Sequence, residues 1–170
     1  MRKKIVTLGE IMLRFSTINY DRISQADSFQ VNYGGAEANV AVGLSCLGIA
    51  SSFVSQVPDN DLGQAVINYL RKYGVDTKHI VKKGDRLGTY YLEQGFDCRS
   101  SKVIYDRANS AITKASSDDF DFDEIFKEAD WFHFSGITLA LGKECINLAT
   151  KALRAAKKHK VKVSFDLNYR

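Results

Sequence analysis

Short apolar segments alternate with amphipathic helical segments, and this alternation limits the possible folds more than any other feature. The strand-like segments, rich in β-branched and aromatic residues, are 4–10, 52–57, 131–137 and 161–167. The segments with apolar residues at helical spacing are 36–47, 62–73, 122–129 and 143–159. Strands that alternate with helices form parallel βαβ units. We therefore predict an α/β fold with a three-layer αβα core around a parallel sheet.

Helix boundaries follow from individual residues. The helix over 36–47 should bury Val40, Leu44 and Leu47 on one stripe, and Gly48 should end it. In the helix over 62–73, Asp61 is expected to cap the start and Gly74 to suit the end.

Two segments interrupt the alternation. Residues 12–33 and 87–107 contain several aromatic residues and alternate in polarity without a helical period. Both are predicted to be antiparallel β excursions, with a hairpin turn at 96–99 in the second. Together they would form a small β-sheet lid over the carboxyl edge of the main sheet, where α/β proteins bind ligands.

Composition excludes several classes of function. The formal net charge is +4, with no run of five basic residues, which argues against nucleic acid as a partner. No apolar stretch approaches the roughly 20 residues of a membrane span. The apolar run after the basic N-terminus breaks at Gly9-Glu10, too early for a signal peptide. We expect a cytoplasmic protein without a membrane partner.

No metal site is predicted. Cys46, Cys98 and Cys145 are widely spaced and are expected to be packed thiols. The acidic residues of 118–124 lack the glycine and terminal glutamate of a calcium loop, and an acidic helix N-terminus explains them.

A pair of glycines before a helix is the most informative local motif. Gly34 and Gly35 precede the helix over 36–47, and Asn39 follows in its first turn. Glycines let the backbone approach a ligand, and free N–H groups at a helix start hold oxygens. A plain strand-to-helix connection would contain the same residues.

The spacing of this motif resembles the first signature of the ribokinase (PfkB-type) carbohydrate kinases. The run Gly34-Gly35-Ala36-Glu37-Ala38-Asn39 is followed at the signature's distance by Gly48. Further motifs in the family's order are Gly9-Glu10, the 58–63 turn, Gly74-Val75, 134–137 and 166–170. Pro58 departs from the signature, which has a glycine there. Within the family the chain is most similar to the kinases of 2-keto-3-deoxygluconate.

The resemblance implies a set of site residues. Gly34, Gly35 and Asn39 match the sugar-binding loop, and Tyr90 matches the aromatic residue that the lid places against the sugar. The other matching residues are Tyr105 and Arg107 at an acidic substrate, Arg170 near the substrate carboxylate and the transferred phosphate, and Asn168 beside it at the nucleotide. It also implies a homodimer formed through the lid.

Arginines suit an acidic sugar, because guanidinium groups bind carboxylates bidentately. A neutral hexose is expected to leave these arginines unpaired. Arg14 also favours an anion, although arginines at such strand positions are commonly surface residues. Tyr90 as a packing residue and Arg107 as a solvated strand-end charge are the alternatives to their site roles. Glu10 is either a carboxylate at the edge of the site or a turn residue, and His133 is expected to be a core histidine.

The implied reaction is phosphoryl transfer from ATP with Mg²⁺ to a hydroxyl of 2-keto-3-deoxygluconate. The family's catalytic Asp lies in a Gly-Ala-Gly-Asp motif, which is absent from these 170 residues. We therefore expect the N-terminal portion of a ribokinase-like domain, with an incomplete sheet and no activity alone. A kinase of a neutral sugar, such as fructose or ribose, and a non-catalytic sugar-binding or dimerising fragment are the alternatives.

Overall fold

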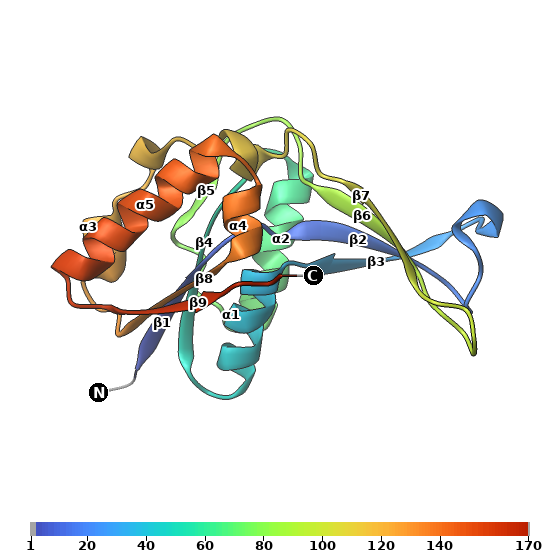
Figure 1. Ribbon diagram of the computed structural model, residues 1–170, viewed down its shortest axis with the longest axis horizontal. Coiled ribbons are helices and arrows are strands. Elements are labelled where there is room, and N and C mark those ends of the chain that lie inside the picture. The colour runs from blue at the N-terminus through green and yellow to red at the C-terminus, as the bar shows by residue number, and fades with distance from the viewer. Residues whose placement is uncertain (1–2, 170) are drawn as a thin grey trace.

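The computed structural model of the chain describes residues 3–169, which form a parallel sheet with helices on both faces (Figure 1). The strand order is β5-β4-β1-β8-β9, and each neighbouring pair is parallel. The strands are β1 (Lys4–Leu8), β4 (Ala50–Val57), β5 (Ile80–Lys82), β8 (Trp131–Ser135) and β9 (Lys162–Asp166). The predicted three-layer α/β core is confirmed.

Helices α3 (Phe122–Phe126) and α5 (Lys143–Lys158) cover one face of the sheet (Figure 1). Leu148 and Ala152 of α5 are fully buried in one cluster with Phe132 of β8. The buried positions of α5 recur every three or four residues, so one side of the helix meets the sheet. Burial of this apolar surface is the main force that holds the layer in place.

Helices α1 (Ala36–Cys46) and α2 (Asp61–Lys72) cover the other face. Ala38 and Ala41 are the apolar residues that α1 buries, together with the carboxylate residue Glu37. The predicted stripe of α1 is wrong, because Leu47 follows the helix and is 78% exposed. Small side chains let α1 lie close to the strands, which the spacing of the larger apolar residues did not indicate.

The start of α2 differs from the prediction, and its end agrees with it. Asn60, one residue before Asp61, caps α2 by accepting hydrogen bonds from the N–H groups of Leu62 and Gly63 at 3.0 and 3.2 Å. Gly74 has a φ of +77°, so it provides the left-handed residue expected after α2.

The predicted strand over 131–137 contains the start of a helix. β8 ends at Ser135, and α4 (Gly136–Ala140) begins at the next residue. The Ser135 hydroxyl accepts a hydrogen bond from the Ile137 N–H at 3.2 Å, as in an N-cap. This turn brings Ile137 to the carboxyl edge of the sheet.

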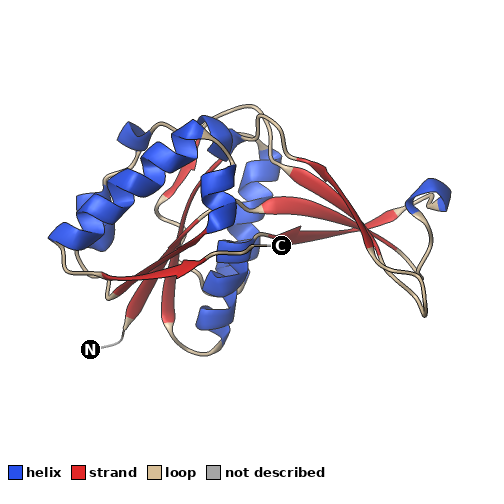
Figure 2. Ribbon diagram, viewed as in Figure 1, coloured by secondary structure: helices blue, strands red, loops and turns tan. Residues whose placement is uncertain are grey.

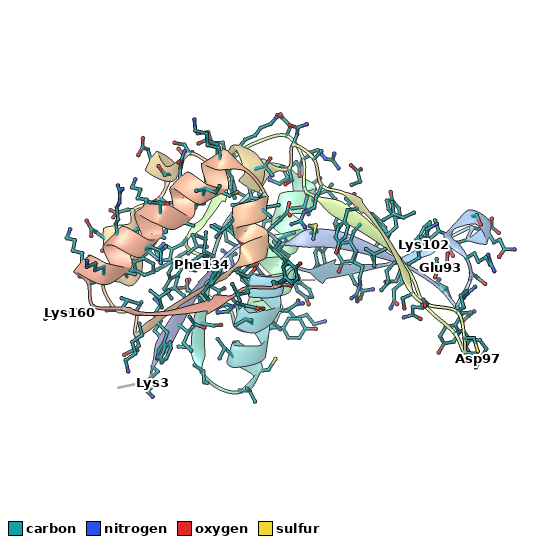
Figure 3. The ribbon with its side chains drawn as sticks, viewed as in Figure 1. Lys3, Glu93, Asp97, Lys102, Phe134 and Lys160 are labelled. Atoms are coloured by element: carbon teal, nitrogen blue, oxygen red, sulfur yellow. The ribbon has the colours of Figure 1, made fainter. Side chains whose placement is uncertain are left out.

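A second sheet extends away from the helices (Figure 2). Its strand order is β3-β2-β6-β7, in which the central β2 and β6 run parallel and the outer pairs antiparallel. The strands are β2 (Met12–Thr17), β3 (Phe29–Gly34), β6 (Thr89–Glu93) and β7 (Lys102–Asp106). Figure 3 shows Asp97 at its far tip, between the paired residues Phe96 and Arg99. The expected second sheet from two excursions is confirmed.

Short 3-10 helices complete the chain, at Ile23–Gln25, Ala111–Lys114 and Ser117–Asp119. Cys145 is buried, and burial raises the pKa of its thiol to about 12, so it stays protonated at neutral pH. Cys46 and Cys98 are exposed, so the prediction of packed thiols is wrong for these two. Within residues 3–169, no helix has the length and apolar character needed to cross a membrane.

β9 is an edge strand with an apolar surface. Among the described residues it pairs with β8 alone, and Val163 and Phe165 are 44% and 43% exposed. Leu167, after the strand, is 74% exposed. An unpaired edge with exposed apolar side chains is a site where another strand can add.

Candidate functional site

A cavity of about 260 Å³ lies where the small sheet joins the carboxyl edge of the main sheet. It is bordered by the loop after β1, the start of α1, strands β2, β6 and β7, and the turn between β8 and α4. The lining residues are Glu10, Met12, Gly34, Gly35, Ala36, Glu37, Asn39, Tyr90, Val103, Tyr105, Arg107 and Ile137. Segments far apart in the sequence therefore meet at one hollow.

Both glycines of the motif lie close to other groups, and Gly35 is required because its close neighbour is backbone. A side chain on Gly34 would overlap the Tyr90 hydroxyl, and a side chain on Gly35 would overlap the backbone carbonyl of Glu10. Gly35 has extended backbone, so close approach, and not an unusual φ, explains the absence of a side chain there. The glycines let the small sheet and the loop after β1 pack directly against the start of α1.

The start of α1 is anchored by a buried carboxylate. Oε1 of Glu37 accepts hydrogen bonds from the Ser135 N–H at 3.0 Å, the Ser135 hydroxyl at 2.7 Å and the Thr138 hydroxyl at 2.7 Å. Glu37 is 1% exposed. These bonds join two walls of the cavity, α1 on one side and the β8–α4 turn on the other. Asn39, two residues further along α1, is exposed and borders the cavity.

Two tyrosines form the wall that the small sheet contributes. Tyr90 of β6 and Tyr105 of β7 are opposite each other in register, and their ring centroids are 5.7 Å apart. Side chains on one face of a sheet stand together in this way because cross-strand partners point to the same side. The rings supply apolar surface and hydroxyl groups to one wall.

Arg107, directly after β7, already has an anionic partner. Its Nε donates to Oε2 of Glu10 at 2.9 Å, and its Nη2 donates to the same oxygen. The guanidinium also lies 5.6 Å from the centre of the Tyr105 ring. The expectation that Arg107 stays unpaired without an acidic ligand is therefore wrong, because Glu10, which is 3% exposed, provides the negative charge.

Two other candidate residues, Arg14 and Asn168, lie outside the cavity wall. Arg14 is beside Asn32 and Tyr90 in strand register and does not line the cavity, and its Nε is buried without a hydrogen-bond partner in the described structure. Asn168 follows β9, and its N–H donates to Asp166 at 2.9 Å. Arg170 lies outside the described residues.

Sequence reasoning missed Glu37 and Ile137 and left the role of Glu10 open. Glu37 is a charged residue among small residues at the start of a buried helix, and this was the available signal. Nothing in the local sequence pairs Glu37 with Ser135 and Thr138, because about a hundred residues separate them. Glu10 and Arg107 are similarly distant in the chain.

The described residues 3–169 cover only part of the expected nucleotide and Mg²⁺ site. This part of the chain holds no group of three or more His, Cys, Asp or Glu residues placed to bind a metal ion. Of the two residues expected at the nucleotide, Asn168 alone is described. The arrangement is suited to holding a small polar ligand by hydroxyl, amide and guanidinium groups.

Larger cavities occur elsewhere in the described residues, among them one of about 320 Å³ bordered by Lys4, Ser45 and Asp76. One of about 530 Å³ lies between α3 and α5, and its charged groups pair with each other across the opening. Hydrogen bonds from Lys158 and His159 lower the pKa of Asp123 there. Another of about 510 Å³ adjoins the candidate site and shares Arg107 and Ile137 with it. The smaller cavity remains the better candidate, because the glycine motif and both tyrosines meet there.

Comparison with known proteins gives consistent results. The model of the pfkB family of carbohydrate kinases matches residues 2–170. The chain is 40% identical to 2-dehydro-3-deoxygalactonokinase of Haloferax volcanii, and the match covers all of this chain and 53% of that protein. It is 31% identical to 2-dehydro-3-deoxygluconokinase of Thermoproteus tenax over 98% of its length and 50% of that protein.

A solved structure shows the same arrangement. The crystal structure of 2-dehydro-3-deoxygluconokinase from Thermotoga maritima has a TM-score of 0.97 and 53% identity, and the match covers 99% of this chain and 52% of that one. The chain thus spans about half the length of the relatives it matches. The family model matches residues 2–170, and the structural match covers 99% of the chain. The chain belongs to the pfkB family of carbohydrate kinases.

Proposed function

We propose that this chain is the substrate-binding portion of an ATP- and Mg²⁺-dependent kinase of 2-keto-3-deoxygluconate, also named 2-dehydro-3-deoxygluconate. The observation that carries the proposal is the convergence of Gly34, Gly35, Asn39, Tyr90, Tyr105 and Arg107 on one cavity. The relatives named for 2-dehydro-3-deoxy sugar acids support the choice of substrate class.

Each wall has a part in binding. The first turn of α1 offers N–H groups and the Asn39 amide to substrate oxygens. Tyr90 and Tyr105 pack against the carbon chain of the sugar and offer hydroxyls. Arg107 receives the carboxylate through the donors that Glu10 leaves free. Arg170 and Asn168, which follow β9, are proposed at the phosphate and nucleotide.

The chemical step needs groups from outside this chain. Phosphoryl transfer requires a base for the attacking hydroxyl and electrostatic stabilisation of the transferred phosphoryl group. ATP supplies that group, and Mg²⁺ neutralises its developing charge when both are bound. Loss of a general base alone slows such reactions by about 10²–10⁴. We therefore propose that the 170 residues bind the sugar acid without phosphorylating it.

A paired assay tests this proposal. In a coupled ADP-release assay, the full-length protein should phosphorylate 2-keto-3-deoxygluconate with a higher kcat/KM than fructose or ribose. The 170-residue chain should bind the same sugar acid by calorimetry and show no turnover. Phosphorylation by the 170-residue chain, or preference of the full-length protein for a neutral sugar, contradicts the proposal. Including the C4 epimer, 2-keto-3-deoxygalactonate, decides which sugar acid is preferred.

A kinase of a neutral sugar is the second candidate. The Glu10–Arg107 pair favours it, because the arginine carries its counter-ion without an acidic substrate. The substrate assay separates the two candidates directly. A non-catalytic sugar-binding fragment remains the outcome if the full-length protein binds sugars and transfers no phosphate.

Two further expectations belong to the proposal. A small-molecule sugar is the expected partner, in an enzyme that uses cytoplasmic ATP. The homodimer through the small sheet stays a prediction, supported by the exposure of Val31, Val103 and Tyr105 on its strands. Light scattering on the full-length protein would test it.

A further inference from the structure

We propose that Glu10 is a positioning residue that fixes the orientation of Arg107 toward the substrate carboxylate. This inference rests on the proposed function of the cavity. It concerns a residue that acts through another side chain, and it predicts a measurable coupling between the two.

Arg107 and Glu10 form a two-contact ion pair that limits how the guanidinium can turn. Both contacts from Arg107 go to Oε2 of Glu10, one from Nε and one from Nη2. A guanidinium has five N–H donors, so its Nη1 end and one Nη2 hydrogen remain for a ligand. The Tyr105 ring lies against the same guanidinium at 5.6 Å. The carboxylate and the ring together leave the guanidinium little freedom to rotate.

Glu10 is itself held in place by burial and by a second hydrogen bond. Its side chain is 3% exposed, and its Oε1 accepts a hydrogen bond from the Ser110 hydroxyl. Each oxygen therefore has its own partner. A buried carboxylate with both oxygens engaged holds its position, whereas a surface carboxylate samples several rotamers.

Arg107 lies between two cavities. The residue borders the candidate site of about 260 Å³ and the adjoining cavity of about 510 Å³. An arginine without a fixed partner can turn toward either. Of these two cavities, Glu10 borders the candidate site and not the other. Its hydrogen bonds with Nε and Nη2 therefore keep the guanidinium at the candidate site.

Glu10 lies where the small sheet joins the main sheet, between β1 and β2. β2 begins two residues after it, and Gly35 after β3 meets its carbonyl. Gly88 before β6 approaches Oε1, and Arg107 after β7 binds Oε2. Residues next to three strands of the small sheet therefore approach Glu10, and the fourth strand begins two residues after it. Glu10 sets Arg107 relative to the sheet that carries Tyr90 and Tyr105.

A double-mutant cycle on the full-length protein tests the proposal. In Glu10→Gln the amide keeps the shape of the side chain and loses the charge that holds the guanidinium. We expect Kd and KM for 2-keto-3-deoxygluconate to rise about tenfold, with kcat changed much less. In the Arg107→Met background the same Glu10→Gln change should alter affinity less than about twofold, because the residue it orients is gone.

The matched control is Glu93→Gln. Glu93 is also a buried carboxylate of the small sheet, accepts a hydrogen bond from the Ile23 N–H at 3.0 Å, and does not border the cavity. Figure 3 shows it in the outer part of that sheet, away from Phe134. Its substitution should leave Kd and KM unchanged. Thermal melts of every variant show whether each is folded.

The outcomes separate this inference from the proposed function. If the unmodified protein phosphorylates no keto-deoxy sugar acid, the proposed function fails. If it does so and Glu10→Gln has the same effect with and without Arg107, the proposal for Glu10 is overturned, because a direct contact or a general structural role would give that result. Unchanged or tighter binding by Glu10→Gln overturns it as well.

Discussion

Two buried carboxylates border the same cavity and are stabilised in different ways. Glu37 receives three hydrogen bonds from neutral donors of the β8–α4 turn, whereas Glu10 is paired with the charged Arg107. Glu37 joins parts of the main domain, and Glu10 joins the main domain to the small sheet. The difference indicates that the first carboxylate mainly supports the fold and the second mainly orients a ligand-binding group.

The largest expected effect is on Glu37. Glu37→Leu leaves the Ser135 N–H and the Ser135 hydroxyl without their acceptor in a buried place, and it leaves the Thr138 hydroxyl with the Leu8 carbonyl at 3.4 Å alone. Unsatisfied buried donors cost about 1–3 kcal/mol each, so the free energy of unfolding should fall by about 3–5 kcal/mol. Urea denaturation measures this change.

The control for Glu37 is the glutamine variant. Glu37→Gln keeps an oxygen that can accept these hydrogen bonds, and it should lose only about 1 kcal/mol. Equal losses in the leucine and glutamine variants would show that the hydrogen bonds of Glu37 are not what stabilises this junction.

A smaller loss of stability is expected at Glu10. Glu10→Leu removes the partner of Arg107, whose side chain is 24% exposed and can turn toward water. Breaking a fully buried ion pair costs about 3–5 kcal/mol, so a pair with one exposed member should cost nearer about 2 kcal/mol. Combining it with Arg107→Met should restore part of that loss in the same denaturation experiment. A Glu10→Leu protein as unstable as Glu37→Leu would remove the distinction between the two carboxylates.

The smallest effect is expected at Asp123, a surface carboxylate whose side chain is 56% exposed. Hydrogen bonds from Lys158 and His159 lower the pKa of Asp123 below its unfolded value of 3.8. A lowered folded pKa means that the stabilising contribution is present above pH 3.8 and is lost as the pH falls through the folded pKa. The difference in unfolding midpoint between the wild type and Asp123→Asn should therefore disappear in acid.

Salt provides the check on Asp123. Charges in full contact with water are screened at high ionic strength, so the same difference should shrink in 1 M salt at neutral pH. A difference that grows in acid, or one that salt does not alter, would contradict the assignment.

The main features of the fold could be predicted because they depend on local signals. Periodicity located α5, glycine located the end of α2, and alternating aromatic residues located the small sheet. Leu47 was misplaced because α1 packs through small residues, which have little effect on an apolar pattern. α4 was missed because its five residues follow directly on a buried strand.

The candidate site was predicted only in part. The described residues that were expected at the substrate line one cavity, whereas Asn168, which was expected at the nucleotide, does not. The partner of Arg107 could not be predicted, because the pairing joins residues 97 positions apart in the chain. Pairings of this kind depend on the three-dimensional path of the chain, and no local spacing encodes them.

The junction around Glu10 has a consequence for protein engineering. Grafting the outer sheet of another family member onto this core would transfer the two hairpins while leaving their common anchor behind. A functional chimera would need compatible residues at 10, 35, 88, 107 and 110 as one set, because each touches Glu10 or is Glu10 itself. Exchanging the hairpins alone would separate them from the residue at position 10 that their ends contact.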